Sequence, residues 1–436
     1  MPRLIVRRSL TAVGIYSSVA LGYLGTVVAT REFDSARVFG DYATVVFATS
    51  FLQSLFDLTV EESLVKYGFR YVTREDWGRL RRLFTSALAF KVGGSLLGAA
   101  GLVVFAVLGP SRLAVPLLIA AGIPLGQSLE GLAAATLLLR ERYDVRAGFL
   151  AWGMALRLAG IAVGAHYGLR EAIAGLLAAQ ILSTASIGVA GWLSFHRFPQ
   201  RHSAPLGEDR RDIVAFIFQS SAATGVLSIR GGLAPLLLGA VTNTTQVGLF
   251  RVAQAPQSAL QALSGPARVM LLTEQTRAWE QGRQSAVLRG IRVYSLAALA
   301  ISVVVVPLLY VFIPDLIRWI NGPAYVGAAG AARVFTFVAA VQFVVGWTKS
   351  LPVTIGRPAL RIWTHGIETL VVLPLVVAFG AVWGATGGAL AVLAGMVVFA
   401  AIWFVIAARI RPQDTAVVSR DDAVAEAEAD AEALLR

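Results

Sequence analysis

The stretch Val293–Ile313, VYSLAALAISVVVVPLLYVFI, contains no charged side chain. A helix needs about 20 apolar residues to cross the hydrocarbon core of a bilayer, and this stretch meets that length. Comparable stretches recur along the whole chain and predict about 12 membrane-spanning helices. The predicted spans are residues 9–30, 38–60, 84–109, 113–139, 147–167, 171–195, 213–241, 244–270, 290–313, 326–348, 359–382 and 386–408.

The composition agrees with a membrane protein. Of the 436 residues, 56% are hydrophobic and only 15% are charged, and the mean hydropathy is +0.69. A soluble domain is usually about half apolar and about a quarter charged. This composition excludes a soluble enzyme, a nucleic-acid binder and a secreted disulfide scaffold. The chain has no cysteine, so disulfides, iron–sulfur clusters and thiolate nucleophiles are excluded as well.

The sequence also lacks the motifs that would carry catalysis. It contains no GxxxxGK[ST] phosphate loop, no GxSxG elbow and no HExxH zinc helix. The histidines, which show no metal-ligand spacing, are His166, His196, His202 and His365. We therefore expect a protein that is not an enzyme and that carries no cofactor and no metal.

Lysines and arginines are distributed unequally between the two sides of the predicted membrane. The N-terminus and the loops on its side carry about 23 of them and the other side about 5, and such an excess marks the cytoplasmic side. Both termini are therefore predicted to be cytoplasmic, with an even number of spans. This asymmetry accounts for most of the net charge of +12, so the expected partner is the lipid bilayer and no nucleic acid.

A weak internal repeat divides the spans into two sets of six. Gly40-Asp41-Tyr42 opens the second span and Gly248-Leu249-Phe250 opens the eighth. At the same offset, Leu52-Gln53-Ser54-Leu55 matches Leu260-Gln261-Ala262-Leu263. Six is an even number, so both halves insert the same way round and are related by an axis along the membrane normal, with the substrate site between them.

The predicted fold is therefore an all-α polytopic membrane protein. About 12 transmembrane helices form two six-helix lobes, which are related by pseudo-two-fold symmetry and enclose a central cavity. The predicted organisation is an N-terminal lobe of helices 1–6 (residues 1–199), a cytoplasmic linker (200–212), a C-terminal lobe of helices 7–12 (213–411) and an acidic cytoplasmic tail (412–436). The tail alternates alanine with glutamate and aspartate and is expected to be disordered.

Charged side chains inside the spans are the candidate functional residues, because such charges usually face a cavity or a partner. The cations are Lys91, Arg157, Arg230, Arg251, Arg268 and Arg333. The acids are Asp57, Glu130 and Glu368. Arg157 lies near mid-depth, where it is expected either to line an anion-binding cavity or to be the buried partner of Glu130 or Glu368.

Other charges leave similar alternatives open. Arg230 is followed by Gly231-Gly232 and Pro235, and a broken helix beside a charge is a feature of transporters. Lys91, Arg251, Arg268 and Arg333 lie nearer to span ends, where a side chain can instead extend to the headgroups.

Each acid inside the spans also has two alternative roles. Asp57 and Glu130 lie toward the cytoplasmic ends of their spans, and each either binds a coupling ion or pairs with Lys91 or Arg157. Glu368, with His365 one turn away, forms either a proton relay or a hydrogen-bonded contact between helices.

Several short motifs resemble those of bacterial polysaccharide (O-antigen type) flippases, within the multidrug/oligosaccharidyl-lipid/polysaccharide exporter superfamily. They are Val38–Tyr42, Gln246–Phe250, Gly265-Pro266 followed by Leu272-Thr273-Glu274, Gly356-Arg357-Pro358 and Trp383–Ala389. The resemblance implies two six-helix bundles that alternate access between the membrane faces. It also implies an undecaprenyl-pyrophosphate-linked oligosaccharide as substrate, moved across the bacterial inner membrane, with polysaccharide polymerase and glycosyltransferases as partners.

The hypothesis is therefore a flippase without enzymatic activity, used in surface polysaccharide and lipopolysaccharide biosynthesis. Its expected pyrophosphate ligands are Arg157, Arg230, Lys91, Arg251 and Arg333, and the expected ion-coupling residues are Asp57, Glu130 and Glu368. Two alternatives remain: an organic-cation antiporter of the same superfamily, and a non-transporting membrane scaffold of a polysaccharide assembly complex. The superfamily's drug exporters typically use acids in spans one and seven, whereas span seven here carries Arg230.

Overall fold

The computed structural model describes residues 2–33, 35–56, 60–263, 275, 278–279, 281–355, 357 and 359–410. Within these residues all regular structure is helical. The predicted acidic tail, Asp57 and Arg268 lie outside the described residues, as do the whole motif Gly265-Pro266 with Leu272-Thr273-Glu274 and two residues of Gly356-Arg357-Pro358.

In the described residues, the N lobe has nine helices. They are α1 (Pro2–Glu32), α2 (Ala36–Phe56), α3 (Val60–Thr73), α4 (Trp77–Leu108), α5 (Ser111–Ala120), α6 (Gly122–Gln127), α7 (Glu130–Leu139), α8 (Tyr143–Tyr167) and α9 (Leu169–His196). Helix α8 packs along α1 on one side and α9 on the other. Where α8 and α9 cross, Gly160 and Gly175 face each other, and a Cβ on either would overlap the carbonyl oxygen of the other.

The C lobe contains the remaining described helices. They are α10 (Asp209–Ser228), the π-helix η1 (Ile229–Leu233), α11 (Ala234–Val241), α12 (Thr244–Ala253), α13 (Ala255–Leu263), α15 (Gln284–Ile320), the 3₁₀-helix η2 (Pro323–Ala328), α16 (Ala329–Val344), the 3₁₀-helix η3 (Gly346–Lys349), α17 (Leu351–Thr354) and α18 (Ala359–Arg409). Helix α18 is interrupted at Gly384, whose φ of 56° lies in the left-handed region that glycine adopts easily. The chain reverses there, so α18 supplies two antiparallel spans.

The 12 predicted spans have counterparts in these helices. Eight stretches of the described chain are long and apolar enough to cross a membrane, and the stretch Ala359–Arg409 contains two predicted spans. The other three spans correspond to α1, to α10 with η1 and α11, and to α12 with α13. The two-lobed, all-α fold predicted from the sequence is confirmed. The linker is shorter than predicted, because α10 already begins at Asp209.

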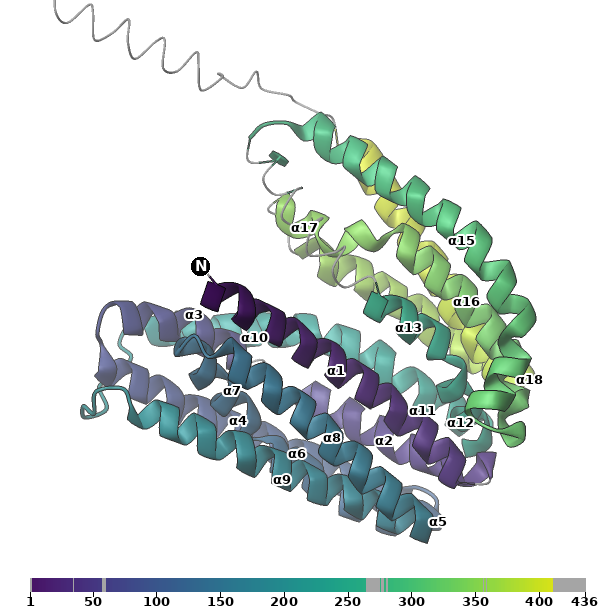
Figure 1. Ribbon diagram of the computed structural model, residues 1–436, viewed down its shortest axis with the longest axis horizontal. Helices are drawn as coiled ribbons and strands as arrows, with labels where there is room; N and C mark the ends of the chain where they lie inside the picture. Colours follow the sequence, from purple (N-terminus) through teal and green to yellow (C-terminus); the bar gives the residue numbers. More distant parts are fainter. Residues whose placement is uncertain are drawn as a thin grey trace, which may run out of the picture.

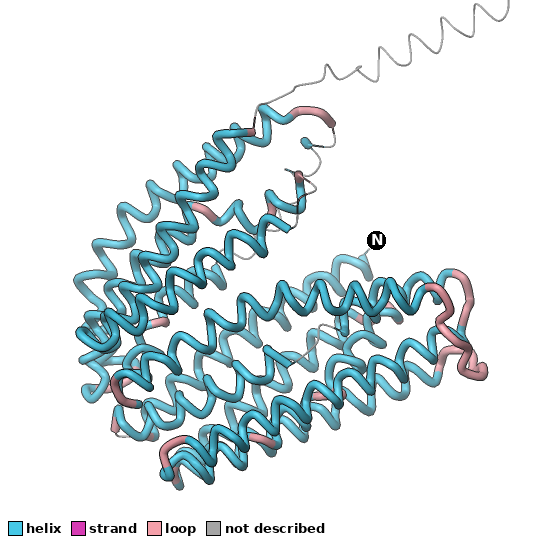
Figure 2. Tube along the Cα trace, turned by 180° about the vertical axis from the view of Figure 1, so that it is seen from behind, coloured by secondary structure: helices cyan, strands magenta, loops and turns pink. Residues whose placement is uncertain are grey.

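The two lobes form a V (Figure 1; Figure 2 shows it from behind). They meet at the end that holds α5 and α12, which we call the closed end. The Gly384 turn lies at the same end, because the Ala385 amide that follows it donates to Gln246 Oε1 on α12 at 2.8 Å. They diverge toward the end that holds the first residues of α1, the α3–α4 turn and the linker between α9 and α10, which we call the basic end. Helix α10 does not follow the rest of its lobe there, because it packs on α2 and α3 as well as on α18.

The sequence repeat lies at the centre of the closed end. Gly40 on α2 and Gly248 on α12, which are equivalent positions of the repeat, lie against each other: a Cβ on Gly248 would come within 2.9 Å of the Gly40 Cα. Such close crossing of helix backbones is typical of glycine pairs in membranes. The two copies of the repeated motif are therefore in contact where the lobes meet.

Polar contacts join the lobes around this glycine crossing. The Arg112 guanidinium donates to Asp41 Oδ1 (3.2 Å) within the N lobe and to Thr244 Oγ1 (3.1 Å) in the C lobe. The buried Tyr325 hydroxyl donates to the Phe33 carbonyl oxygen at 2.8 Å. These bonds connect the lobes at the closed end.

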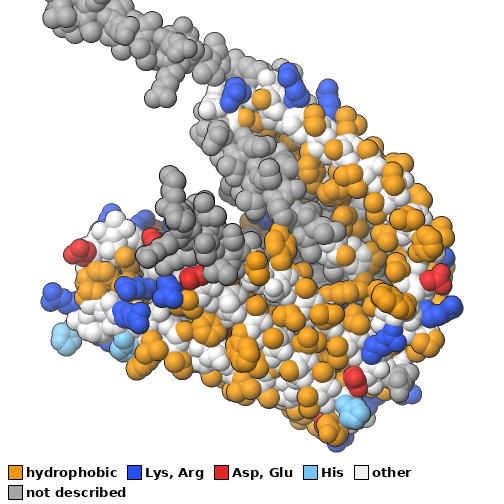
Figure 3. Space-filling model, in the orientation of Figure 1, with side chains coloured by type: hydrophobic (Ala, Val, Ile, Leu, Met, Phe, Trp, Pro, Cys, Tyr) orange, Lys and Arg blue, Asp and Glu red, His pale blue; other side chains and the backbone are white. Residues whose placement is uncertain are grey.

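The surface matches a membrane environment. Hydrophobic side chains cover the lengths of the helices, whereas Lys and Arg gather toward the ends of the lobes (Figure 3). Large apolar side chains such as Leu108 (79% exposed) and Leu370 (75% exposed) would be costly in water. The chain is a multi-pass membrane protein, and these side chains face lipid.

Candidate functional site: an arginine-lined cavity and a buried ion pair

A cavity of about 390 Å³ lies inside the N lobe and is closed on one side by α12. Helices α1, α2, α6, α8 and α9 supply its other walls. Its polar lining residues are Thr26, Tyr42, Thr49, Ser50, Gln53, Ser54, Gln127, Arg157, Gln180 and Arg251. Among the described residues that line this cavity, none is acidic. The cavity thus combines two arginines, uncharged hydrogen-bonding groups and apolar walls.

Arg157 is held in place by a chain of hydrogen bonds. Its guanidinium donates to Gln180 Oε1, and Gln180 Nε2 donates in turn to Glu130 Oε2 and to Thr184 Oγ1, both at 2.9 Å. Gln180 is only 1% exposed. Glu130 is therefore linked to Arg157 through an amide and not by the direct pairing that was one alternative. The guanidinium keeps donors for a ligand, because it has five N–H groups.

Arg251 reaches the same cavity from the other lobe. It lies on α12 with its guanidinium carbon 5.3 Å from the centre of the Phe47 ring, a cation–π arrangement. Arg251 also lines a second cavity of about 460 Å³, which lies between α1 and the α12–α13 segment. Its side chain therefore separates two hollow regions of the molecule, and it brings a C-lobe charge to an N-lobe site.

Lys91 and Glu130 border a smaller cavity of about 130 Å³. The Lys91 ammonium, on a side chain that is 5% exposed, forms an ion pair with Glu61 Oε1 at 3.0 Å. Glu61 lies on α3, just beyond the predicted end of the second span. Lys91 thus pairs with Glu61, an acid that lies just outside the predicted spans. Among the described residues, Glu130 forms no direct ion pair with Lys91.

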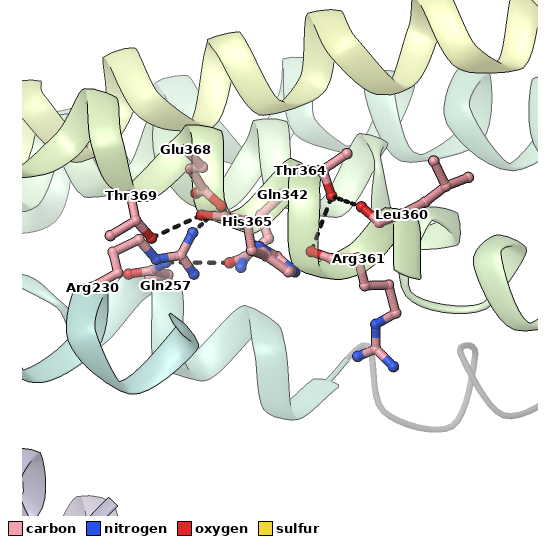
Figure 4. Close-up of polar contacts among 9 residues, drawn as sticks. All are labelled: Arg230, Gln257, Gln342, Leu360, Arg361, Thr364, His365, Glu368 and Thr369. Atoms are coloured by element: carbon pink, nitrogen blue, oxygen red, sulfur yellow. Dashed lines mark hydrogen bonds and ion pairs between the residues drawn. The ribbon is translucent and has the colours of Figure 1, made fainter. Parts of the chain in front are cut away.

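The C lobe holds a separate polar cluster at the π-helix (Figure 4). Arg230 forms an ion pair with Glu368, and His365 Nδ1 lies 3.0 Å from the same carboxylate oxygen. The Glu368 side chain is 3% exposed and that of Arg230 is 25% exposed. Beside them Gln257 donates to Gln342 across α13 and α16 at 3.3 Å. The structure therefore brings together the broken span, its cation and the predicted acid–histidine pair.

Breaking this ion pair is expected to destabilise the protein. Arg230→Met leaves the Glu368 carboxylate buried without its cation, which typically costs about 3–5 kcal/mol. The double variant Arg230→Met/Glu368→Met removes both charges and is expected to regain most of that loss. Thermal unfolding of the purified protein in detergent micelles measures both variants. Equal stability of the single and the double variant would contradict the pairing.

Arg333 lies apart from all of these groups. Its Nε donates to the Tyr310 carbonyl oxygen at 3.0 Å, and its guanidinium carbon lies 4.8 Å from the centre of the Tyr310 ring. Tyr310 is 44% exposed on α15, so the pair sits on the outer side of the C lobe. None of the cavities described here is lined by Arg333.

Three glutamines hold the polar groups of the N-lobe cavity, although charge does not mark them in the sequence. Gln53 and Gln127 hydrogen-bond to each other in the N-lobe cavity, and Gln180 holds Arg157. A glutamine in an apolar span needs a partner for its amide just as an ion needs one, so amides within the spans were an available signal. Charge alone does not identify these amides.

The two-lobed helical fold and its arginine-lined cavity define a polytopic membrane protein with an enclosed, positively charged polar site. Within that class, the chain belongs to the polysaccharide biosynthesis protein family, whose sequence profile matches residues 8–269. The family resemblance based on the glycine motifs is therefore confirmed. No protein with a curated description matches the chain significantly.

Solved structures with this fold cover nearly the whole chain. The lipid II flippase MurJ in an inward closed conformation matches with a TM-score of 0.69 and 12% identity, over 92% of this chain and 87% of that one. An inward-facing multidrug resistance MATE family transporter of the MOP superfamily matches with 0.62 and 14% identity, over 93% and 97%.

A MOP superfamily transporter from Pyrococcus furiosus, described by the reverse polarity of its binding pocket, matches with a TM-score of 0.59 and 12% identity, over 92% of this chain and 95% of that one. At such identities the three matches establish a shared fold and leave the substrate to be argued from the site.

Proposed function

We propose that this protein is a flippase that carries an undecaprenyl-pyrophosphate-linked oligosaccharide from the cytoplasmic to the outer leaflet of the bacterial inner membrane. Arg157 and Arg251 bind the pyrophosphate, the sugar occupies the aqueous space between the lobes, and the polyprenyl tail stays in lipid. The activity serves O-antigen-type surface polysaccharide biosynthesis, with glycosyltransferases supplying the substrate and a polymerase consuming it.

One observation carries the proposal: two arginines from different lobes share a cavity whose described lining includes no acid. Guanidinium groups bind phosphate oxygens through charge-assisted, often paired hydrogen bonds. Placing an arginine inside the membrane costs up to roughly 2.5–3.5 kcal/mol on insertion scales, so two arginines that share a cavity without an acid point to an anionic ligand. An organic-cation exporter would need the opposite polarity at this position.

The lobe geometry supports alternating access. Hydrogen bonds and a glycine crossing hold the lobes together at the closed end, and the lobes diverge at the basic end. With the basic end on the cytoplasmic side, as the lysine and arginine distribution predicts, the structure corresponds to an inward-facing state that receives its substrate from the cytoplasmic leaflet.

The ion pair at the π-helix is our proposed coupling element. Glu368 lies between Arg230 and His365, so protonation of its carboxylate would release Arg230 as a third anion ligand. A membrane potential of 100 mV supplies about 2.3 kcal/mol per charge moved, enough to bias such a cycle. We propose Asp57 and Glu130 as further coupling residues. Of the other expected cations, Lys91 pairs with Glu61 beside the smaller cavity and remains a proposed ligand, whereas Arg333 contacts Tyr310 away from the described cavities and is left out of the proposed site.

Reconstituted liposomes test the function. A fluorescent undecaprenyl-pyrophosphate oligosaccharide is placed in the outer leaflet, and its protection from an added glycosidase is followed after a potential is applied. The flippase is expected to protect it, and liposomes without protein are not. Transport of an organic cation without any lipid-linked flux would favour the antiporter. Absence of both activities in correctly folded protein would favour the scaffold.

A further inference from the structure

A fourth cavity lies at the basic end, away from the candidate site. Its volume is about 420 Å³, and α3, α4, α10 and the linker between the lobes form its walls. Its lining residues are Val60, Ser63, Arg82, Leu83, Ser86, Ala87, Phe90, Pro205, Leu206, Gly207, Arg210, Ile213, Val214 and Ile217. The proposed transport function makes no use of this cavity.

The linker wall of the cavity is fixed to the start of α4. The Ala204 amide donates to the Gly78 carbonyl oxygen at 3.1 Å. The Arg81 guanidinium donates to the Arg201 carbonyl oxygen (3.1 Å) and to Gln200 Oε1 (2.9 Å). Gly207, with φ of 60°, then turns the chain into α10. The cavity is therefore a defined feature of the fold and not a gap beside a loose loop.

Two arginines at this cavity lack the acidic partners that neighbouring arginines have. Arg70 and Arg79 both form ion pairs with Asp209, at 3.2 and 3.9 Å. In the part of the chain that the structure describes, neither Arg82 nor Arg210 forms an ion pair with an acid, and none of the lining residues is acidic. Both side chains are exposed, so the cavity presents two available positive charges.

The rest of the lining is largely apolar and runs along the helices. From Arg82 to Phe90 on α4 the helix rises about 12 Å, and from Arg210 to Ile217 on α10 about 10 Å. Arg82 lies just before the predicted start of the third span at residue 84. The charges therefore lie at headgroup level, and the apolar part extends to the depth of acyl chains.

We propose that this cavity binds an anionic phospholipid of the cytoplasmic leaflet. Arg82 and Arg210 contact the phosphate, and one acyl chain lies between α4 and α10 against Phe90 and Ile217. Two cations close to an anionic headgroup favour it over a zwitterionic one by roughly 10- to 30-fold. Because α10 packs on α3 and also on α18, the lipid occupies the junction through which the lobes are connected at the basic end.

The test is lipid binding by the purified full-length protein. Phosphatidylglycerol is titrated against phosphatidylcholine, and retained lipid is counted by native mass spectrometry. The double variant Arg82→Ala/Arg210→Ala is expected to lose the phosphatidylglycerol preference by about tenfold or more. The matched control Arg289→Ala/Arg292→Ala removes two exposed arginines at the start of α15 and is expected to keep it. Equal preference in both double variants would overturn the proposal.

A second variant separates lipid from free anion. Ser86→Trp fills the apolar slot and leaves both arginines, so it is expected to abolish phosphatidylglycerol retention. Inorganic phosphate at millimolar concentration is expected not to displace the lipid from the unaltered protein. Displacement by phosphate, or retention of lipid by a folded Ser86→Trp protein, would contradict an acyl chain in this cavity. Thermal unfolding in phosphatidylcholine micelles verifies that each variant is folded, and Arg82→Gln replaces any double variant that is not.

Discussion

Arg157→Ala is expected to abolish transport of the pyrophosphate-linked oligosaccharide while leaving the protein folded and inserted. The guanidinium lies in a cavity whose described lining has no acid, so its removal creates no unpaired carboxylate beside it. A pyrophosphate entering the altered cavity would lose a charge-assisted partner, which typically costs 2 kcal/mol or more. The flux should therefore fall by about 30-fold at least.

Three further variants test whether the loss of transport is specific to the arginines of this cavity. Arg251→Ala is expected to have a similar effect, because Arg251 lines the same cavity. Arg157→Lys keeps the charge and loses the fork geometry, so an intermediate flux is expected. Arg333→Ala removes an intramembrane arginine that contacts Tyr310 and lines none of the cavities described, and it is expected to transport normally. Normal flux in Arg157→Ala would remove the anion site from the mechanism.

The spans could be predicted from the sequence because their signal is local. Stretches such as Val293–Ile313 are apolar on all sides, and no folding partner is needed to recognise them. Breaks within spans were harder to find. The span predicted at 113–139 consists of three short helices, α5, α6 and α7. The first interruption, at Ala121, leaves the hydropathy unchanged because it is a local backbone turn in an apolar run. The second falls at the polar residues Gln127, Ser128 and Glu130, which lower the hydropathy without showing that the helix breaks there.

The candidate site could be predicted only in part, because its geometry depends on packing between distant segments. The depth of Arg157 in its span allowed the prediction that it lines a cavity. That Arg251 lines the same cavity could not be predicted, because α12 of the other lobe closes the cavity. The pairing of Lys91 with Glu61 was not foreseen, since Glu61 lies beyond the apolar run. Its depth in the protein is set by how α3 packs on α4 and α7, which the hydropathy does not record.

The short internal repeat marks a duplicated unit and also a point where the two lobes touch. Matching triplets at Gly40 and Gly248 first indicated a duplicated six-span unit, and the structure places these same glycines in contact. A residue on a two-fold axis meets its own symmetry equivalent. A small residue there allows the two lobes to approach closely, so the motif retained in both halves is also the point where the halves touch.

Gly248→Leu is therefore expected to keep the closed end from closing and to abolish transport. A Cβ on Gly248 would lie 2.9 Å from the Gly40 Cα and 3.0 Å from the Ala36 carbonyl oxygen. Both are backbone atoms of α2, so the strain cannot be relieved by a side-chain rotation. The helices must separate, and the Arg112–Thr244 hydrogen bond that joins the lobes is lost with them.

Cysteine labelling measures this opening directly, because the chain has no cysteine of its own. Val247→Cys, at an apolar position on α12 that is 0% exposed, leaves the Arg112–Thr244 hydrogen bond intact and is expected to react slowly with a membrane-impermeant maleimide added outside. Adding Gly248→Leu should increase that rate at least tenfold, since a buried thiol becomes accessible. Gly290→Leu is the matched control, because a Cβ on Gly290 meets no atom within 4 Å, and it should change neither labelling nor flux. Slow labelling and normal flux in Gly248→Leu would show that the lobes do not need this contact to alternate.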